Sequence, residues 1–544
     1  MPVDVVSALD YHALEGLKIL YLNMPLRESA KPNNAPLGPG LLASRTRMYG
    51  AEVSILDLNA YRLEDEAVKD KPNGRWLTYD ETSSLLERHI NQHGEPDIIA
   101  LSGMITTLRW QQFVVSTCRQ LVPDAFIISG GGLATDIKTG LFNWIPELDA
   151  VVRSEGDDVI LLLGKDVLEA RLHQHRDMSH LPQCLGEQNG RLRFLYEGSR
   201  PPDLDILPFP AWDLLHQDVL GNSILEQYIQ VPIWGLAANN SSATPFQMTR
   251  SMNTVATWGC PYACKFCHRG ATGSRLYDLR SPEKLAEEAS WLQRRYGIDF
   301  LGFVDDNFAV NPTHIACLPE AFKPLGGLRW GTHTRLDEAS DDRVFDMAKA
   351  GCIYIGFGAE SASEHVLEEM GKGGFILRPR GSKTNQLSRI NGFDFPTTMV
   401  KGIQNCQAAG IHGNCTWIMA YPGERLEDLK TTVGFILWQM ETATSREAVN
   451  QKIFVFTAYP GTEALRAPRV QQQLRANFGL SFDACGSPVA DNAMLDYVLE
   501  LDDATKVMHD RDGRPLNFGA MSEDQFLQAR EHVDRGNIEG ILDM

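Results

Sequence analysis

The stretch Cys260-Pro-Tyr-Ala-Cys264-Lys-Phe-Cys267 decides the fold, and the chain reaches it through Thr254-Val-Ala-Thr-Trp-Gly259. Three and then two residues separate its cysteines, in a tight loop flanked by glycine and proline. Thiolates at this spacing can converge on one face of a metal cluster, which a lone pair of cysteines cannot do. A four-iron cluster held by only three ligands keeps one iron open for a substrate or cofactor. The spacing therefore indicates an iron–sulfur site.

Two other readings of the three cysteines are open to argument. A structural zinc ion takes four ligands, and the neighbouring His268 is too close in sequence to be assumed as the fourth. A disulfide framework needs an even number of cysteines, and a group of three argues against it. We therefore expect a 4Fe-4S cluster with three protein ligands, Cys260, Cys264 and Cys267.

Composition bounds the class of protein. The 544 residues suffice for about two or three domains, and 43% hydrophobic with 22% charged residues is typical of a soluble globular chain. A net charge of −19 argues against nonspecific nucleic-acid binding, which needs an excess of Lys and Arg. We expect no membrane span, because no apolar run reaches roughly 18 residues. The first residues, Met1 to Val6, lack a basic region before an apolar core, so no secretory signal is expected. The seven other cysteines are interpreted as buried reduced thiols, which favours the cytoplasm.

The N-terminal part alternates short apolar runs with amphipathic segments. Strands are predicted at 18–23, 52–57, 97–102, 125–129 and 150–153, with helices at 41–49 and 110–121. Buried apolar strands separated by helices are typical of a parallel, doubly wound α/β sheet.

Such a sheet binds ligands at the carboxyl ends of its strands. Glycine and small polar residues collect there, and glycines let backbone approach a ligand closely. Three successive glycines after a strand are, taken alone, more often a turn than a site. The candidate ligand-binding residues are Ser102, Gly103, Thr106, Gly130, Gly131, Gly132, Glu155 and Gly156.

A second run of strands and helices follows the cysteines. A helix is predicted from Pro282, capped by Ser281, and strands at 300–304, 353–357, 415–421 and 452–456. Repeated β/α units with polar residues at the strand ends predict a barrel or part of one. Residues 372–398 interrupt this rhythm as an inserted loop, which could bear on substrate choice. Polar candidates at strand ends are Asp305, Asn307, Arg335, Glu360 and Ser361.

The cysteine spacing, with the aromatic Phe266 before the last cysteine, resembles the signature of the radical S-adenosylmethionine (SAM) enzymes. Gly358-Ala-Glu-Ser361 resembles a SAM-contacting segment of that family, and the resemblance covers about residues 251–460. The glycine-lined upstream sheet resembles the cobalamin-binding domain of the cobalamin-dependent branch. The segment 203–213, rich in proline, resembles the linker between two such modules.

This resemblance implies a division into four parts. These are a Rossmann-like cobalamin-binding domain at 1–165, a linker region at 166–250, a radical SAM partial (β/α) barrel at 251–460 and a small C-terminal domain at 461–544.

The resemblance also implies roles for single residues. The open iron would hold SAM, with Phe266 near its adenine, Glu360 and Ser361 at its ribose and methionine, and Arg335 at its carboxylate. Asp305 and Asn307 would lie where SAM or substrate binds. Ordinary packing, a helix N-cap, a surface ion pair and turn formation are the respective alternatives. We assign no residue a catalytic role.

Many cobalamin domains carry Asp-x-His-x-x-Gly after the first strand. Asp10-Tyr-His12-Ala-Leu-Glu-Gly16 is one residue too long and precedes that strand, so it is interpreted as chance. Cobalamin would then bind without a histidine below the cobalt, and a vestigial domain without cobalamin is the alternative.

The predicted function is a cobalamin-dependent radical SAM methyltransferase, which moves a methyl group from SAM through methylcobalamin to an unactivated carbon or phosphorus. Its predicted partners are a small-molecule substrate, of natural-product type, and an electron donor such as flavodoxin or ferredoxin. Two other enzyme classes are weighed: radical rearrangement or ring formation without methyl transfer, and polar methylation of an aromatic ring. A cobalamin- or redox-sensing module is the non-enzyme alternative, which the barrel pattern after the cysteines disfavours.

Overall fold

A computed structural model describes residues 9–26, 32, 34–62, 77–172, 178–230, 248–268, 276–373, 377–378, 381–502 and 506–544. The expectation about residues 1–6 lies outside this range. The described residues divide into two compact units. Unit 1 combines Met1–Tyr228 with Val489–Lys506, and unit 2 combines Ile229–Pro488 with Val507–Met544.

Unit 1 is built on a parallel sheet of apolar strands. In the described part of the chain its seven strands have the order β2-β1-β3-β4-β5-β7-β6, parallel except for β6. The order 2-1-3-4-5 is that of flavodoxin-like doubly wound folds, whose ligand crevice lies where the order reverses, here between β1 and β3. The predicted doubly wound class is confirmed. The strands are β1 (Lys18–Asn23), β2 (Glu52–Asp57), β3 (Ile98–Ser102), β4 (Phe126–Gly130), β5 (Ala150–Arg153), β6 (Cys184–Gln188) and β7 (Arg191–Glu197).

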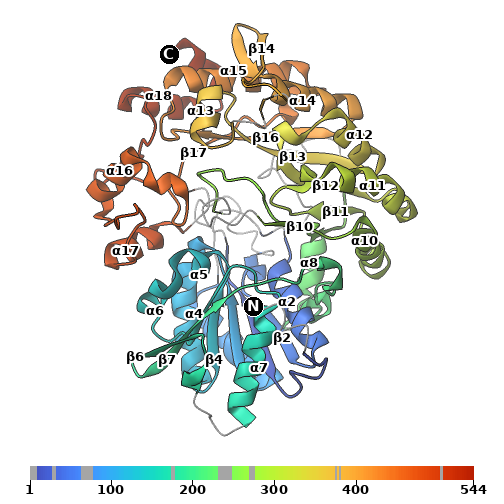
Figure 1. Cartoon of the computed structure of the whole chain (residues 1–544), viewed down its shortest axis with the longest axis vertical. Coiled ribbons are helices and arrows are strands. Elements are labelled where there is room, and N and C mark those ends of the chain that lie inside the picture. The colour runs from blue at the N-terminus through green and yellow to red at the C-terminus, as the bar shows by residue number, and fades with distance from the viewer. Residues whose placement is uncertain are drawn as a thin grey trace. The chain divides into compact units, whose positions relative to one another are not determined.

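Helices cover this sheet, and those that precede residue 173 are blue to teal in Figure 1. The capping box that starts α3 shows why they begin where they do. The Thr78 hydroxyl accepts the Glu81 N–H at 3.2 Å, and the Glu81 carboxylate accepts the Thr78 N–H at 2.7 Å. The helices are α2 (Leu37–Met48), α3 (Tyr79–His93), α4 (Leu108–Leu121), α5 (Gly132–Ile137), α6 (Leu141–Trp144), α7 (Val159–Leu172), α8 (Ile224–Ile229) and α17 (Asn492–Glu500).

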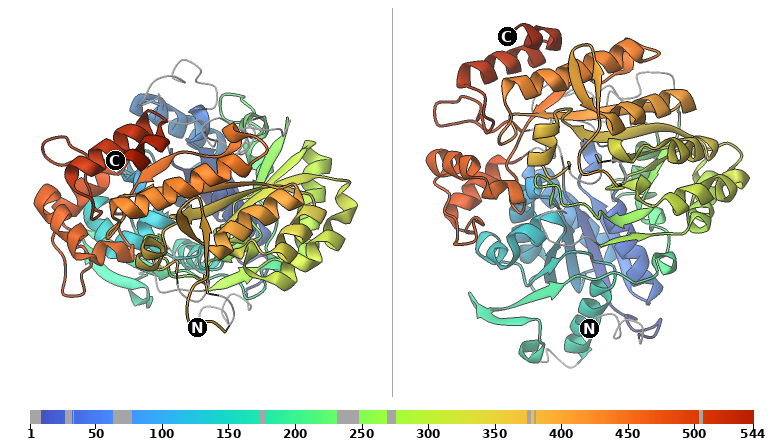
Figure 2. Two further views of the ribbon diagram at one scale, coloured as in Figure 1. Left: turned by 90° about the horizontal axis from the view of Figure 1, so that it is seen from above. Right: turned by 45° about the horizontal axis from the view of Figure 1, so that its top comes forward.

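The predicted linker region contains regular structure that belongs to unit 1. β6 and β7 form an antiparallel hairpin, and β7 pairs with β5 in parallel, so the sheet continues beyond β5 (Figure 2). Unit 1 therefore extends to Tyr228 instead of ending near residue 165. The segment predicted as a C-terminal domain is also divided, because residues 489–506 belong to unit 1 and the rest to unit 2.

Unit 2 contains a second parallel sheet. Its six described strands have the order β17-β16-β13-β12-β11-β8, an open sheet that fits the predicted partial barrel. Helices α10, α11, α12, α14 and α15 lie along the outer side of the curved sheet (Figure 1). The strands are β8 (Ser251–Thr254), β11 (Phe300–Phe303), β12 (Arg329–Arg335), β13 (Cys352–Glu360), β16 (His412–Met419) and β17 (Ile453–Val455).

Large aromatic side chains fill the space between this sheet and its helices. Trp330 on β12 and Trp417 on β16 are fully buried, and their rings lie 6.0 and 5.6 Å from Phe322 and Phe435 of the helix layer. Each such burial contributes roughly 2–3 kcal/mol. The outer faces of the strands thus form the core, which leaves the strand ends to carry polar groups.

The predicted start of α10 is confirmed: Ser281 caps it by accepting the Lys284 N–H at 3.1 Å, and Pro282 is its first residue. The helices of unit 2 are α10 (Pro282–Tyr296), α11 (Pro312–Phe322), α12 (Asp341–Lys349), α13 (Glu364–Glu369), α14 (Thr397–Ala409), α15 (Leu426–Thr442), α16 (Pro468–Phe478) and α18 (Glu523–Asp534). None of the described helices of the chain is long and apolar enough to cross a membrane.

The predicted inserted loop contains a hairpin, β14 (Leu387–Ile390) and β15 (Phe393–Pro396). Asn391 and Gly392 have φ of 50° and 89°, as a two-residue type I′ turn requires. Phe395 is fully buried, with its ring 5.2 Å from Phe435 of α15. The hairpin therefore packs on an outer helix, and its described residues give no support to a role in substrate choice.

Candidate functional site

The three-cysteine loop of unit 2 follows β9 (Thr257–Gly259), which pairs with β10 (Tyr277–Leu279). Gly259 has a φ of 84°, a conformation that glycine adopts without strain and that turns the chain into Cys260. Lys265 anchors the loop on both sides: its N–H donates to the Met370 carbonyl and its carbonyl accepts the Ala464 N–H, each at 2.8 Å. The loop is therefore held by segments more than a hundred residues away in sequence.

The donor set of this loop fits an iron–sulfur cluster. Cys260, Cys264 and Cys267 are free thiols. Burial raises the pKa of the Cys260 thiol to about 11, and the other two thiols are close enough to raise it further. Among the described residues, no three His, Cys, Asp or Glu side chains converge as ligands of one metal ion would. The three free thiols are compatible with a cluster in which each thiolate binds a different iron.

Asp305 supports the segment that leads into the loop. Its carboxylate is buried and accepts the N–H groups of Ala256 and Thr257, at 3.1 and 2.5 Å. Burial raises the pKa of this carboxyl to about 7, although the hydrogen bonds lower it. Asp305 thus has a positioning role in the structure, and a direct contact with SAM stays a prediction.

Asn307 lies beside the first cysteine. Its Nδ2 is 4.0 Å from the Cys260 Sγ, and its Oδ1 accepts from the Thr334 hydroxyl at 2.5 Å and the Arg335 N–H at 3.3 Å. The end of β12 therefore orients the amide so that its donor side faces the cysteine loop.

Arg335 reaches the second cysteine. Its Nη1 is 3.3 Å from the Cys264 Sγ, and its Nε and Nη2 donate to the two Asp337 carboxylate oxygens at 3.0 and 2.8 Å. Burial lowers the pKa of this guanidinium, but Asp337 more than offsets that effect and raises it, so the side chain stays cationic. Most N–H donors of the Arg335 guanidinium already have protein partners in the structure. The contact of Arg335 with the SAM carboxylate stays a prediction.

Glu360 and Ser361 point in different directions. Glu360 has a φ of 64° and pairs with the buried Lys372, whose Nζ is 3.2 Å from Glu360 Oε1 and 5.8 Å from the Phe266 ring centroid. Glu360 and Phe266 thus lie on either side of one cation at the cysteine loop. Ser361 is fully buried and its hydroxyl is 3.1 Å from that of Thr432 on α15, which supports a structural role for it.

The sequence interpretation missed Asp337 and Lys372 as site residues. Asp337 follows Arg335 by two residues, a spacing that could have suggested an ion pair at a strand end. Lys372 stands between Gly371 and Gly373, but it was assigned to the inserted loop.

The glycine-rich edge of unit 1 is closely packed. A Cβ added to Gly131, whose φ is 86°, would lie 2.8 Å from the Gly103 carbonyl oxygen, and one added to Gly103 would lie 2.3 Å from the Thr107 hydroxyl. The contact between the β3 and β4 turns therefore requires Gly131, and the packing of the Thr107 and Gln111 side chains requires Gly103. A Cβ on Gly130 would touch the Leu101 carbonyl oxygen and Val152 at 3.9 Å, and one on Gly132 would touch the Met104 Cα at 3.8 Å, which are ordinary van der Waals contacts. An alanine therefore fits at either position without a clash.

The other predicted residues of this edge are held by the protein. Ser102 ends β3, and Thr106 is buried in the turn after it. Glu155 is 3.6 Å from the Arg200 guanidinium, and a Cβ on Gly156 would touch Leu42 of α2 at 3.2 Å. A role of these residues in cobalamin binding stays a prediction. His12 is exposed beside Glu15, before β1, as the chance interpretation of its motif requires.

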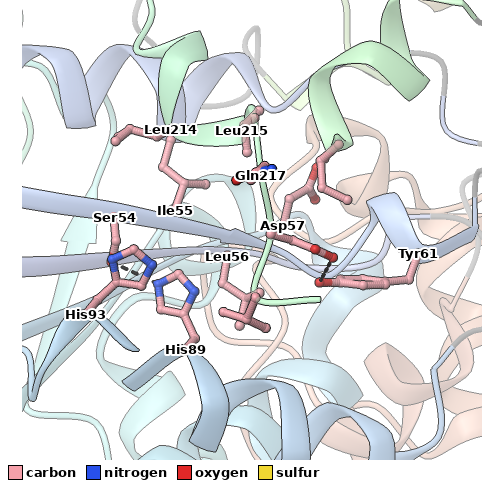
Figure 3. A pocket seen from close by; sticks show the side chains of 13 residues that line it. Ser54, Ile55, Leu56, Asp57, Tyr61, His89, His93, Leu214, Leu215 and Gln217 are labelled. Carbon is pink, nitrogen blue, oxygen red and sulfur yellow. Dashed lines mark hydrogen bonds between the residues drawn. The ribbon is translucent and has the colours of Figure 1, made fainter. Parts of the chain in front are cut away.

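A pocket at the free edge of β2 is too small for a cofactor. Figure 3 shows Asp57 and Tyr61 on one side of it, and His89 and His93 of α3 on the other. Its volume is about 40 Å³, room for water molecules only. Burial lowers the pKa of His89 to about 3, so its imidazole is neutral, and its Nε2 is 3.0 Å from the Ser54 hydroxyl.

Residues 254–436, which include all three cysteines of the loop, match the family profile of the radical SAM superfamily. This part of the chain is therefore a radical SAM domain. Across most of its length, the chain is similar to an uncharacterized methyltransferase of Pyrococcus horikoshii, at 24% identity over 82% of each chain. It is 25% identical to the cytidylyl-2-hydroxyethylphosphonate methyltransferase of Streptomyces wedmorensis, over 79% of this chain and 77% of that protein.

A solved structure is similar in fold to this chain. The radical SAM methyltransferase TsrM from Kitasatospora setae, determined with cobalamin and a 4Fe-4S cluster, aligns with a TM-score of 0.62. The alignment covers 96% of this chain and 90% of that one at 15% identity, a level at which the likeness shows the fold alone.

Proposed function

We propose that the chain is a cobalamin-dependent radical SAM methyltransferase, which moves a methyl group from SAM to an unactivated carbon or to phosphorus of a small molecule. The observation that carries the proposal is the cysteine loop: three free thiols in a radical SAM match, with the Asn307 amide and the Arg335 guanidinium facing two of the sulfurs. The flavodoxin-like sheet of unit 1 and the methyltransferase names of the relatives support the cobalamin and methyl-transfer parts.

The residues of the chain would bind and orient the cofactors. Cys260, Cys264 and Cys267 would hold the cluster, while Glu360 and Phe266 would contact SAM beside it. Gly130 and Gly132, at the end of β4 and the start of α5, would face cobalamin in unit 1. When bound, the cluster supplies the electron that cleaves SAM, and cobalamin supplies a carrier for the methyl group. We place the enzyme in the reducing cytoplasm, with a donor such as flavodoxin or ferredoxin.

Anaerobically reconstituted protein tests the proposal. With SAM and dithionite, wild-type protein should hold four irons per chain and form 5′-deoxyadenosine and methionine. The Cys260→Ala, Cys264→Ala, Cys267→Ala triple variant should hold no cluster and form neither product. A full four-iron cluster in the triple variant would refute the assignment of the ligands.

Screening of small-molecule substrates then separates the reaction classes. Radical methylation predicts one deoxyadenosine, one methionine and one S-adenosylhomocysteine for each methylated product. A substrate deuterated at the reacting position should pass its label to deoxyadenosine, because the radical is held next to that hydrogen. Methylation with S-adenosylhomocysteine but no deoxyadenosine would indicate the polar reaction, and deoxyadenosine with an unmethylated, rearranged product would indicate the cyclase class.

A further inference from the structure

The Arg335 guanidinium is held by the protein in a way that binding of a SAM carboxylate does not explain. It is locked in place before any ligand arrives, since the residue is 6% exposed and three hydrogen bonds hold it. Asp337 accepts two of them, and the Lys372 carbonyl accepts the third from Nη2 at 2.9 Å. Nη1 has no oxygen partner among the described residues and lies 3.3 Å from the Cys264 Sγ.

The cysteine loop itself braces the guanidinium. The Arg335 guanidinium carbon lies 4.4 Å from the ring centroid of Tyr262, which stands between the first two cysteines. The Tyr262 hydroxyl donates to Glu338, and Glu338 is paired with Arg343. The Tyr262 ring thus fixes the plane of the Arg335 guanidinium, and Asp337 fixes its direction. As a result, Nη1 points toward the Cys264 sulfur.

We propose that Arg335 is a positioning residue that donates a hydrogen bond to the Cys264 thiolate of the cluster and thereby raises the reduction potential of that cluster. This inference rests on the proposed function, because it requires the cluster. It goes beyond that function by assigning Arg335 to the cluster sulfur.

The sign of the effect follows from charge. Reduction adds an electron to a cluster whose thiolates are already negative. An N–H donor or positive charge at a sulfur stabilises the reduced form more than the oxidised form, which raises the potential. The Asp337 carboxylate acts in the opposite direction, because it places a negative charge next to the guanidinium.

The test compares four variants with the wild type, all reconstituted anaerobically and titrated by electron paramagnetic resonance without SAM. Arg335→Gln should lower the potential by about 59 mV, a tenfold fall in the ratio of reduced to oxidised cluster at a fixed potential. Arg335→Lys keeps the charge but cannot reach Asp337 and the sulfur together, so it should give a smaller fall. Asp337→Asn should shift the potential upward.

Arg343→Gln is the matched control, because it removes a cation that contacts Tyr262 through Glu338 and touches no cysteine. In this variant the ratio of reduced to oxidised cluster at a fixed potential should differ from the wild-type ratio by less than about threefold. A direct readout uses protein labelled with ¹⁵N-arginine: the reduced cluster should show coupling to an arginine nitrogen in the wild type and in Arg343→Gln, and none in Arg335→Gln.

The outcomes are distinguishable. Unchanged potentials in Arg335→Gln and Asp337→Asn, with four irons retained, overturn the inference even if SAM binding weakens. Arg335→Gln could fail to retain iron. In that case the inference is overturned if the reduction potential of Asp337→Asn does not rise. It is also overturned if the wild-type cluster shows no coupling to an arginine nitrogen. A wild-type chain that takes up no iron overturns the proposed function instead.

Discussion

Glu424 carries a carboxyl group that no solvent reaches. One of its oxygens accepts the Ala420 N–H, and the other has no hydrogen-bond partner among the described residues. Burial raises the pKa of this carboxyl from 4.5 to about 8. Because the folded-state pKa is the higher one, the stability that this group contributes is fully present below about pH 4.5 and is lost as the pH rises through about 8.

Glu424→Gln should remove that pH dependence. The glutamine amide oxygen can accept from Ala420, and the side chain carries no charge to desolvate. We expect the free energy of unfolding of the variant, relative to wild type, to rise by about 2 kcal/mol between about pH 5 and pH 8. The measurement is denaturant unfolding at several pH values. Glu427→Gln, at an exposed position of α15, is the control and should give a flat difference. A flat difference for Glu424→Gln would contradict the raised pKa.

At the scale of single residues, the sequence located polar groups well and their partners poorly. Asp305, Asn307 and Arg335 were each predicted at strand ends, and all three contact the cysteine loop or the segment leading into it. The bonds of Arg335 to Lys372 and Cys264 depend on how the end of β12 meets the segments after α13 and β9, which no local pattern encodes. Ala420 is instructive in the same way: its φ of 60° lies in the left-handed region, which only glycine adopts without strain and which the sequence does not reveal.

The turn after β4 allows a test at the scale of one element. Gly131→Ala would place a Cβ 2.8 Å from the Gly103 carbonyl oxygen at a φ of 86°. We expect it to destabilise unit 1 by about 2–3 kcal/mol, since both backbone strain and a clash with backbone oppose it. Gly130→Ala meets nothing nearer than 3.9 Å and should change stability by less than about 0.5 kcal/mol.

The same pair separates a turn from a ligand site. Thermal unfolding of each variant, followed by far-ultraviolet circular dichroism, gives the stability, and the absorbance of released corrinoid gives the cobalamin bound per chain. Gly130→Ala should bind less cobalamin while remaining as stable as wild type, because the added methyl group fits the protein but opposes the close approach of a ligand to this backbone. Wild-type stability of Gly131→Ala, or full cobalamin binding by Gly130→Ala, would count against these assignments.

Strands with continuous apolar runs were predicted, and a strand with few apolar residues was not. β1 and β5 lie at the predicted residues, because nearly all of their side chains are buried. β12, Arg-Trp-Gly-Thr-His-Thr-Arg, has one apolar residue in seven, and its interior face carries polar groups at the end that reaches the cysteine loop. A strand near a functional site loses the apolar signal that would reveal it.

At the scale of the molecule, the chain order does not match the spatial units. Residues 489–506, far along the sequence, belong to unit 1. α17 contacts α4 through the Arg109 Nη2, which donates to the Leu499 carbonyl at 3.3 Å. A contact across almost four hundred residues depends on surface complementarity that a sequence pattern does not record. The two α/β modules could be predicted from the sequence. The return of residues 489–506 to unit 1 could not.

The separation of the units predicts independent cofactors. The three cysteines and their donors lie in unit 2, whereas the glycine turns of β3 and β4 lie in unit 1. The Cys260→Ala, Cys264→Ala, Cys267→Ala variant should therefore lose all iron yet bind about one cobalamin per chain, because no residue is shared between the two candidate sites. Gly131→Ala should show the converse, with weakened cobalamin binding and a full complement of iron. Both contents are measured on one preparation, with the melting curve as a control for folding. Loss of cobalamin by the triple variant, at an unchanged melting temperature, would mean that the cluster loop takes part in holding cobalamin and that the two sites are not independent.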